Sequence, residues 1–351
     1  MTLPKGRLRV GVLFGGQSAE HTVSLMSGQA IMDALALRHQ VVPIGISQDG
    51  RFLPGADVRA ALAGSGQMAT SETALAPTEA VAGLDVVVVA LHGPKGEDGT
   101  VQGLLELAGI PYVGSGVLGS AVSMDKAMMK GAFSAAGLPV GPWRLIRQAD
   151  WEEDPERALA SLHDFALPVF VKPANMGSSV GISRVDGWAK LAPALSQAFR
   201  HDRRAVVEQG LSARELECGV IGNDRPAASV VGEVVSHHAF YDYEAKYQPD
   251  GADLMIPADL PAEFAERARD LAVQAFLAVD AAGLARVDMF LAGETLYLNE
   301  INTLPGFTPY SMFPRLWQAS GLDYPALLDQ LIAYALERHG KAGPDRGRGR
   351  S

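Results

Sequence analysis

The sequence predicts a mixed α/β fold with more than one domain, and three observations support this prediction. The chain has 351 residues, which exceeds the usual size of a single hydrophobic core. Its first third alternates apolar runs such as LDVVVVALHG with helical patterns, which is typical of a parallel sheet covered on both faces. Its last third contains ARVDMFLAGETLYLNEINT, in which a short glycine turn separates two strand patterns.

An amino-terminal domain is expected over residues 1–123. The segments RLRVGVLF, VVPIGI and LDVVVVALHG predict strands, and a helix is predicted near SLMSGQAIMDALAL. Residues 55–83 are rich in Ala, Gly, Ser and Thr, so we expect a mobile surface excursion with a short helix there.

A central domain is expected over residues 124–210, where the pattern changes. MDKAMMKGAFSAAG predicts a helix that ends at Gly137, and LPVFVKP and RAVVEQ predict strands.

A carboxy-terminal domain is expected over residues 211–340. It contains the strand patterns ELECGVIG and ASVVGEVVS, a helix from about Pro261, the hairpin described above, and a closing helix that ends at Gly340. The helix carries one apolar stripe, formed by Phe264, Ala268, Leu271 and Ala275. Residues 341–351 are basic and glycine-rich, so a disordered tail is predicted.

Composition and charge narrow the class of function. The chain has 40 acidic and 30 basic residues and a formal charge of −10. This negative net charge does not attract nucleic acid or an anionic membrane. Its single cysteine, Cys218, has no partner for an internal disulfide and suits a reducing compartment. The amino-terminal apolar run is too short for a signal peptide, and no later run is long enough to span a bilayer. We therefore expect a cytoplasmic protein that acts on small molecules.

The hairpin near the end of the chain predicts a metal site. Because strand side chains alternate between faces, Arg286 and Asp288 share one face of the first strand. Glu300 and Asn302 likewise share one face of the second strand. Oxygen ligands without nearby His or Cys favour magnesium held together with nucleotide phosphates. A solvent-exposed polar face is the alternative interpretation.

The loop NTLPGFTPYSMFP follows these predicted ligands directly. Backbone amides at Gly306, or near Ser311 and Met312, are candidates to receive a carboxylate or a developing oxyanion. A plain connecting loop is the competing interpretation.

The middle of the chain contains a candidate polyphosphate site. PVFVKPANMGSSVGISRV places Lys172 at the end of an apolar strand, before a flexible turn over residues 177–181. A lysine charge and exposed backbone N–H groups are what a polyphosphate requires, although the segment is not a Walker A loop. Lys126 and Glu208 also fit a nucleotide, but each by itself is more often a surface charge.

Six segments occur in order along the chain: FGGQSAEHTVSL, LHGPKGEDGTVQG, VKPANMGSSVG, FYDYEAKY, RVDMF and NEINTLPGFTPYSMFP. Together they resemble the D-alanine–D-alanine ligases of the ATP-grasp superfamily, and the resemblance runs from about Arg9 to Arg338. It implies a three-domain ATP-grasp fold with an amino-terminal Rossmann-like parallel sheet. ATP is then expected between the sheets of the second and third domains.

The resemblance also implies roles for individual residues that bind metal and nucleotide. It assigns magnesium to Asp288, Glu300 and Asn302. Residues that match nucleotide contacts are Lys126 and Lys172 at the phosphates, Glu208, Leu211 and Lys246, and Glu215 at the ribose.

The remaining implied roles concern the amino-acid substrates and the lid segment FYDYEAKY. Ser178, in the glycine loop, is expected to link Glu20 to Tyr247 of the lid. Other residues that match substrate contacts are Arg286 and the Gly306 backbone at the acyl phosphate and oxyanion, His92 near the first carboxylate, and Ser311 and Met312 at the second carboxylate.

The implied reaction joins two D-alanine molecules, with ATP and two Mg²⁺ ions, for which Mn²⁺ can substitute. The resemblance also suggests a homodimer. A D-alanine–D-lactate ligase is an alternative that Tyr247 argues against. Another ATP-grasp carboxylate–amine ligase and a non-catalytic nucleotide-binding module are further alternatives. The last ranks lowest because Asp288, Glu300 and Asn302 are all present.

Overall fold

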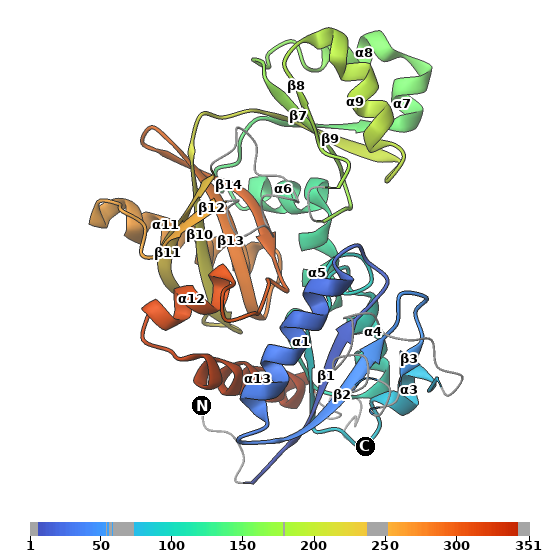
Figure 1. Cartoon of the computed structure of the whole chain (residues 1–351). Coiled ribbons are helices and arrows are strands. Elements are labelled where there is room, and N and C mark those ends of the chain that lie inside the picture. The colour runs from blue at the N-terminus through green and yellow to red at the C-terminus, as the bar shows by residue number, and fades with distance from the viewer. Residues whose placement is uncertain are drawn as a thin grey trace, which may run out of the picture.

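The computed structural model describes residues 6–53, 55, 58, 74–177, 180–236 and 252–342. Figure 1 shows three lobes, each built around its own sheet. One sheet is mostly parallel and the other two are antiparallel, which confirms the predicted mixed α/β class. Most of the predicted surface excursion and of the tail lies outside the described residues.

The amino-terminal sheet has the strand order β3-β2-β1-β4-β5. The pairs β1–β2, β1–β4 and β4–β5 are parallel, as predicted, and only the short edge strand β3 is antiparallel. Its elements are β1 (Arg9–Gly15), α1 (His21–Leu35), β2 (Gln40–Ile46), β3 (Phe52–Leu53), α3 (Pro77–Ala80), β4 (Val86–Val89), α4 (Thr100–Ala108) and β5 (Tyr112–Val113). Because β1 and β4 are parallel neighbours, the chain leaves both at one edge, and Glu20 and His92 come to this edge.

The central lobe contains a four-stranded sheet in the order β6-β9-β7-β8. Its elements are β6 (Trp143–Arg147), α7 (Gln148–Glu153), α8 (Pro155–Ala160), β7 (Val169–Pro173), β8 (Ser183–Val185), the 3-10 helix Trp188–Lys190, α9 (Leu191–Ala198) and β9 (Arg204–Gln209). Lys172 and Glu208 lie on the neighbouring strands β7 and β9. The predicted strands of this segment are therefore confirmed.

The carboxy-terminal lobe contains an antiparallel sheet in the order β12-β11-β10-β13-β14. Its elements are β10 (Arg214–Gly222), β11 (Ala227–Ser236), β12 (Ala252–Met255), α11 (Ala262–Ala278), β13 (Gly283–Ala292), β14 (Thr295–Asn302), α12 (Met312–Ala319) and α13 (Tyr324–Ala342). The predicted stripe of α11 packs into the core of this lobe: Ala268, Leu271 and Ala275 are buried and Phe264 is partly buried. Cys218 is buried on β10, as expected for a small apolar residue.

The helix predicted from Met124 to Gly137 is confirmed as α6 (Lys126–Ala135), but it begins two residues later than expected. Asp125 has an extended backbone, with ψ at 106°, and it separates α5 (Val117–Met124) from α6. The Asp125 carboxylate accepts hydrogen bonds from the N–H groups of Ala127 and Met128, so it is the N-cap of α6. The prediction of a helix was correct, but Asp125 was not identified as its N-cap.

Two helices each pack against a lobe other than the one expected from their place in the sequence. Met129 and Phe133 of α6 lie in the core beside the carboxy-terminal sheet, although the expected boundaries assign them to the central domain. At the other end, α13 packs against α1 and β5 of the amino-terminal lobe. It continues to Ala342, two residues beyond the expected end.

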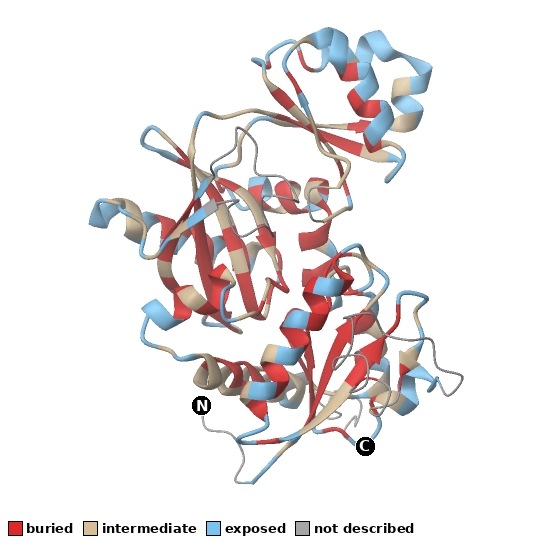
Figure 2. Cartoon of the chain, in the orientation of Figure 1, coloured by how far each residue is buried: buried red, intermediate tan, exposed pale blue. Residues whose placement is uncertain are grey.

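Buried residues are concentrated in the sheets and on the helix faces turned toward them, as Figure 2 shows. By contrast, α7 and α8 contain no buried residue. Among the described residues, no helix is both long enough and apolar enough to cross a membrane.

Gly28 allows α1 to lie directly against β1. A Cβ at this position would be 2.7 Å from Phe14 Cβ, an atom that cannot move without its strand. We expect Gly28→Ala to lower the free energy of unfolding by about 1–3 kcal/mol, because the added methyl overpacks the core. Gly103→Ala in α4 is the matched control, since no atom lies within 4 Å of its added Cβ.

The control should be stabilising by about 0.5–1 kcal/mol, because alanine has the higher helix propensity. Urea denaturation of both variants measures the difference. Equal effects of the two substitutions would contradict the close contact at Gly28.

Candidate active site

The predicted metal hairpin forms with the expected strand faces. In the register of β13 and β14, Arg286 lies opposite Asn302 and Asp288 lies opposite Glu300. Asn299 is an extra residue between Glu300 and Leu298, because Asp288 pairs with Glu300 while Met289 pairs with Leu298. This irregularity redirects the strand beside the polar groups, as bulges near active sites commonly do.

Arg286 is held between two carboxylates. Its Nε and a terminal nitrogen donate to the two oxygens of Asp288 at 2.7 and 2.6 Å, and Nε lies 2.9 Å from Oε2 of Glu217. Burial opposes the charged guanidinium, but Asp288, Glu217 and Glu300 raise the pKa of Arg286 well above its usual value. Glu217 was missed by sequence reasoning. The sequence does contain an indication of it. Glu215 and Glu217 are two residues apart in a strand, so their side chains lie on one face of β10.

A second buried cluster of charges lies between the central and carboxy-terminal sheets. Glu208 Oε2 accepts from Lys172 Nζ at 2.8 Å, and Glu208 Oε1 lies 3.3 Å from Lys130 Nζ. Lys130 also donates to the Asn299 carbonyl at 3.1 Å, so it connects α6 to both sheets. Sequence reasoning missed Lys130, although it lies four residues after Lys126 and thus near it on the helix surface.

The charges of this cluster depend on one another. Burial disfavours the ionised carboxyl of Glu208, but Lys130 and Lys172 outweigh it and lower the pKa of Glu208 to about 2. Burial similarly opposes the charge of Lys172, but Glu208, Glu300 and Glu215 raise its pKa. The pKa of Lys130 is lowered, because burial and the neighbouring Lys172 oppose its charge more than Glu208 supports it. Lys172 is therefore the more firmly charged of the two lysines.

Lys126 lies at the start of α6 and connects this helix to the glycine loop. Its Nζ donates to the Met176 carbonyl at 2.6 Å, and its backbone N–H donates to the Ala174 carbonyl at 2.8 Å. The loop then continues into Ser178 and Ser179, which lie outside the described residues. Thus Lys126 and Lys172, which are far apart in sequence, flank the same loop.

The residues expected around adenine and ribose lie at the junction of the two antiparallel sheets. A Cβ added to Gly141 would be 3.5 Å from Leu211, which places that side chain beside the entry to β6. Glu215 lies opposite Phe290 near the start of β10, and its carboxylate contributes to the raised pKa of Lys172. Glu208 and Glu215 are thus close to Lys172, and Leu211 lies beside Gly141, whereas Lys246 lies outside the described residues.

Glu20 lines a cavity of about 420 Å³ between the amino-terminal lobe and the glycine loop. It is the N-cap residue of α1, and its side chain makes no capping hydrogen bond. Cβ atoms added to Gly93 and Gly177 would lie 3.0 and 3.7 Å from Glu20 Oε2. The carboxylate therefore approaches both backbones closely. Its predicted partners, Ser178 and Tyr247, lie outside the described residues.

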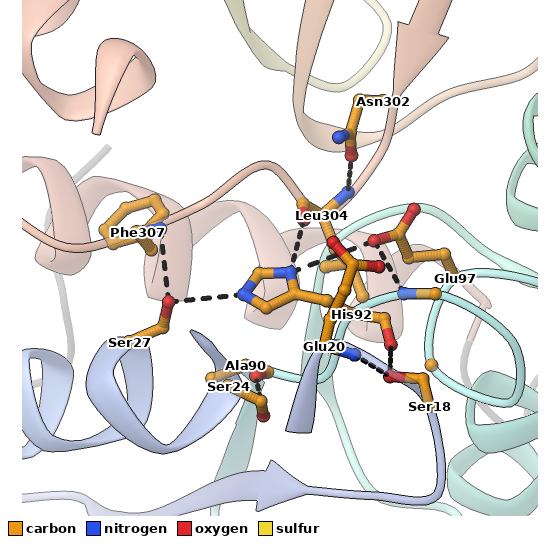
Figure 3. Close-up of polar contacts among 12 residues, drawn as sticks. Ser18, Glu20, Ser24, Ser27, Ala90, His92, Glu97, Asn302, Leu304 and Phe307 are labelled. Carbon is orange, nitrogen blue, oxygen red and sulfur yellow. Dashed lines mark hydrogen bonds and ion pairs between the residues drawn. The ribbon is translucent and has the colours of Figure 1, made fainter. Parts of the chain in front are cut away.

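His92 is only 5% exposed and points toward the carboxy-terminal lobe (Figure 3). Its Nδ1 lies 3.0 Å from the Leu304 carbonyl and 3.8 Å from Glu97 Oε1, and its Nε2 lies 3.2 Å from Ser27 Oγ. Burial opposes protonation of the ring, but Glu97 and Glu20 outweigh burial and raise the pKa of His92. His92 is thus connected to the loop after β14 and is not among the residues that line the cavity.

That loop is fixed at several points. Asn302 Oδ1 accepts from the Leu304 N–H at 3.1 Å, and the Tyr324 hydroxyl donates to the Phe307 carbonyl. Ser311 is the N-cap residue of α12, and its hydroxyl accepts from the Thr308 N–H at 3.1 Å. A Cβ on Gly306 would lie 3.1 Å from Ser311 Oγ, so the two predicted substrate contacts are close neighbours.

The donor set fits a magnesium ion that shares its coordination with phosphates. Asp288 and Glu300 supply carboxylate oxygens and Asn302 an amide oxygen, which are hard ligands. Among the described residues, no group of three or more His, Cys, Asp or Glu could hold a metal ion unaided. Because Asp288 also accepts from Arg286, a metal bound here must share this carboxylate with the guanidinium.

The buried position of Glu208 predicts a specific pH dependence of stability. Its folded pKa of about 2 lies below the ordinary value of 4.5, so its contribution is complete above pH 4.5 and is lost as the pH falls toward 2. We expect Glu208→Gln to remove this dependence and to destabilise the central lobe by about 3–5 kcal/mol at pH 7, because two buried lysines lose their partner.

Urea denaturation followed by tryptophan fluorescence measures this effect, since Trp143, Trp151 and Trp188 lie in the central lobe. Asp164→Asn is the matched control, because the Asp164–Arg144 ion pair is largely exposed. The control should cost less than about 1 kcal/mol. Equal costs for the two variants would show that Glu208 does not hold the lysines.

Comparisons with known proteins identify the family. A family model described as D-ala D-ala ligase N-terminus matches residues 9–115, and one described as D-ala D-ala ligase C-terminus matches residues 132–333. A D-alanine–D-alanine ligase of Geobacillus kaustophilus is 47% identical over 95% of this chain and 96% of that protein. A D-alanine–D-alanine ligase of Deinococcus radiodurans is 49% identical over 94% of this chain and 98% of that protein.

Solved structures give the same result. The D-alanine–D-alanine ligase of Coxiella burnetii matches with a TM-score of 0.81 and 34% identity, covering 96% of both chains. The VanG D-Ala:D-Ser ligase of Enterococcus faecalis matches with a TM-score of 0.81 and 32% identity, covering 94% of this chain and 100% of the other. The resemblance carried by the six sequence segments is therefore confirmed, and this chain belongs to the D-alanine–D-alanine ligase family of ATP-grasp enzymes.

Proposed function

We propose that this enzyme joins two D-alanine molecules to D-alanyl-D-alanine, for the synthesis of peptidoglycan precursors. A carboxylate oxygen of the first D-alanine attacks the γ-phosphorus of ATP, and ADP leaves. The amine of the second D-alanine then attacks the carbonyl carbon of the acyl phosphate, loses a proton, and expels phosphate. The observation that carries the proposal is the convergence of Asp288, Glu300 and Asn302 with the buried Lys172.

The cationic side chains supply the electrostatic stabilisation that phosphoryl transfer requires. Lys126 and Lys172 flank the glycine loop and would bind the ATP phosphates. Asp288, Glu300 and Asn302 would hold two Mg²⁺ ions, for which Mn²⁺ could substitute, and the bound metal would supply positive charge to neutralise the phosphates. Glu208, Leu211, Glu215 and Lys246 would contact the nucleotide, with Glu215 at the ribose.

The amino-acid substrates lie on the opposite side of the phosphates in this proposal. Glu20 faces the 420 Å³ cavity, where it would bind the ammonium group of the first D-alanine. Ser178 and Tyr247 would complete a hydrogen-bonded chain with Glu20 that holds the lid closed and excludes water. Sites for the reacting and second carboxyl groups would be formed by His92, Arg286, the Gly306 N–H, Ser311 and Met312.

Two wider properties belong to the same proposal. The enzyme acts in the cytoplasm, consistent with its single buried cysteine. It functions as a homodimer, as the family resemblance implies. Size-exclusion chromatography with light scattering tests the second property, because a monomeric mass throughout the active concentration range would contradict it.

The substrate assignment is tested by identifying products by mass. We expect phosphate release and D-alanyl-D-alanine with ATP and D-alanine, and no dipeptide with L-alanine. A mixture of D-alanine and D-lactate at neutral pH should still give mainly the dipeptide. If D-alanyl-D-lactate were the main product, the substrate assignment would be wrong although the ATP-dependent chemistry would stand.

The metal assignment predicts the effect of Glu300→Gln. We expect kcat to fall by at least about 100-fold, because the charge that helps hold the metal against the phosphates is removed. Glu294→Gln is the matched control, since Glu294 lies exposed at the turn of the same hairpin. The control should keep kcat within about twofold, as expected for a surface substitution. Near-normal turnover by Glu300→Gln at ordinary magnesium concentration would refute the assignment.

The acyl phosphate predicts an isotope exchange. In ATP labelled with ¹⁸O at the β–γ bridge, reversible transfer to the first D-alanine frees ADP, whose β-phosphate rotates before ATP re-forms. The label should therefore move from the bridge to non-bridging positions, as phosphorus NMR can detect. Absence of exchange during turnover would favour a reaction without this intermediate.

A further inference from the structure

Ser27 joins two segments that the proposed reaction uses. It lies in α1, its side chain is buried, and its hydroxyl is 3.2 Å from His92 Nε2. The same hydroxyl accepts from the Phe307 N–H at 3.4 Å, directly after Gly306. Figure 3 shows Ser27 between the imidazole ring and this backbone amide. His92 also reaches the second segment directly through the Leu304 carbonyl, so Ser27 adds a second link further along the loop, at Phe307.

The direction of these hydrogen bonds follows from elementary chemistry. The Leu304 carbonyl can only accept, so His92 Nδ1 must carry a proton. In the neutral ring Nε2 is then an acceptor and the Ser27 O–H is its donor, whereas in the protonated ring, which Glu97 and Glu20 favour, Nε2–H donates to the Ser27 oxygen. The lone pairs of the same oxygen remain available for the Phe307 N–H. The Ser27 hydroxyl therefore orients the His92 ring and also accepts a hydrogen bond from the Phe307 N–H.

Phe307 is held from both sides. Its N–H donates to Ser27 of α1, and its carbonyl accepts from Tyr324 of α13. Its ring packs against Phe313 and Tyr324, with centroids 5.7 and 5.4 Å apart. The peptide unit after Gly306 is thus positioned by helices that lie outside the carboxy-terminal sheet.

We propose that Ser27 is a positioning residue, whose hydroxyl aligns His92 with the Gly306–Phe307 backbone and so couples the sites of the two D-alanine molecules. This inference rests on the proposed function. Its effect on catalysis passes through His92 and Phe307, because the buried hydroxyl does not line the cavity next to Glu20. Small displacements of such positioning groups have large effects on rate.

Ser24 provides a matched control in the same helix. Its buried hydroxyl accepts from the Gly15 N–H at 2.8 Å and donates to the Ala90 carbonyl at 2.5 Å, so it joins β1 to the end of β4. Figure 3 shows that Ser24 bonds to Ala90, away from the His92 ring. Ser24→Ala and Ser27→Ala therefore remove the same group, with similar burial, from different partners.

The kinetic test compares the two variants in the full-length enzyme with ATP, magnesium and D-alanine. We expect Ser27→Ala to lower kcat/KM for D-alanine by about 10-fold to 100-fold, while the KM for ATP changes by less than about twofold. Ser24→Ala should change all constants by less than about twofold. Unchanged constants in Ser27→Ala, or equal losses for D-alanine and ATP, would overturn the proposal.

Hydrogen exchange tests the link independently of activity. In the protein without added substrates, Ser27→Ala should accelerate exchange of the Phe307 amide by about 10-fold, because its acceptor is lost. Ser24→Ala should instead accelerate the Gly15 amide and leave Phe307 unchanged. Phe307 exchange that is equal in Ser27→Ala and the unmodified protein would refute the link. If the unmodified enzyme formed no D-alanyl-D-alanine, the proposed function would fail, and the exchange result would still decide the link.

Ser27→Cys covers the case in which Ser27→Ala does not fold. The thiol keeps a weak donor and acceptor at the same position, so D-alanine kinetics should lie between those of the alanine variant and the unmodified enzyme. A Ser27→Cys enzyme with unchanged kinetics and unchanged Phe307 exchange would count against the need for a hydroxyl.

Discussion

The mutual dependence of buried charges is the constraint on which the rest of the site depends. Glu208 lies between Lys130 and Lys172, and Arg286 lies between Asp288 and Glu217. A buried charge that loses its partner costs several kcal/mol, so these side chains cannot reorient independently. The fold therefore keeps charged groups in a poorly solvated region, where their fields would act strongly on the nucleotide of the proposed reaction.

These clusters require elements from different lobes. Lys130 comes from α6, Glu208 and Lys172 from the central sheet, and the Asn299 carbonyl from the irregularity in β14. Because α6 packs into the core beside the carboxy-terminal sheet, it carries Lys126 and Lys130 to the junction of both sheets. The central lobe is thereby connected to the carboxy-terminal lobe through buried ion pairs as well as through the chain. A change in the charge of these side chains would therefore affect how the two lobes are held together.

The amino-terminal lobe contributes through α1 and the turn after β4. Glu20 lies at the start of α1 and Ser27 about two turns later, so one helix reaches both the cavity and the loop after β14. Since α13 packs against α1 and holds the Phe307 carbonyl, the end of the chain stabilises the same loop. This arrangement explains how residues far from the metal hairpin can influence the proposed amine attack.

The sequence by itself determined the mixed α/β class, the hairpin of β13 and β14 and the family, because strand alternation and motif order are local properties. It placed the start of α6 two residues too early, at Met124, because Asp125 was not identified as the N-cap. Roles expected for Ser178, Lys246 and Tyr247 stay predictions, because these residues lie outside the described part of the chain. Only the tertiary structure showed that Lys130, Glu217 and Ser27 contact residues of the proposed site. Their importance comes from burial and from partners on other elements, and neither property is encoded in the residues next to them.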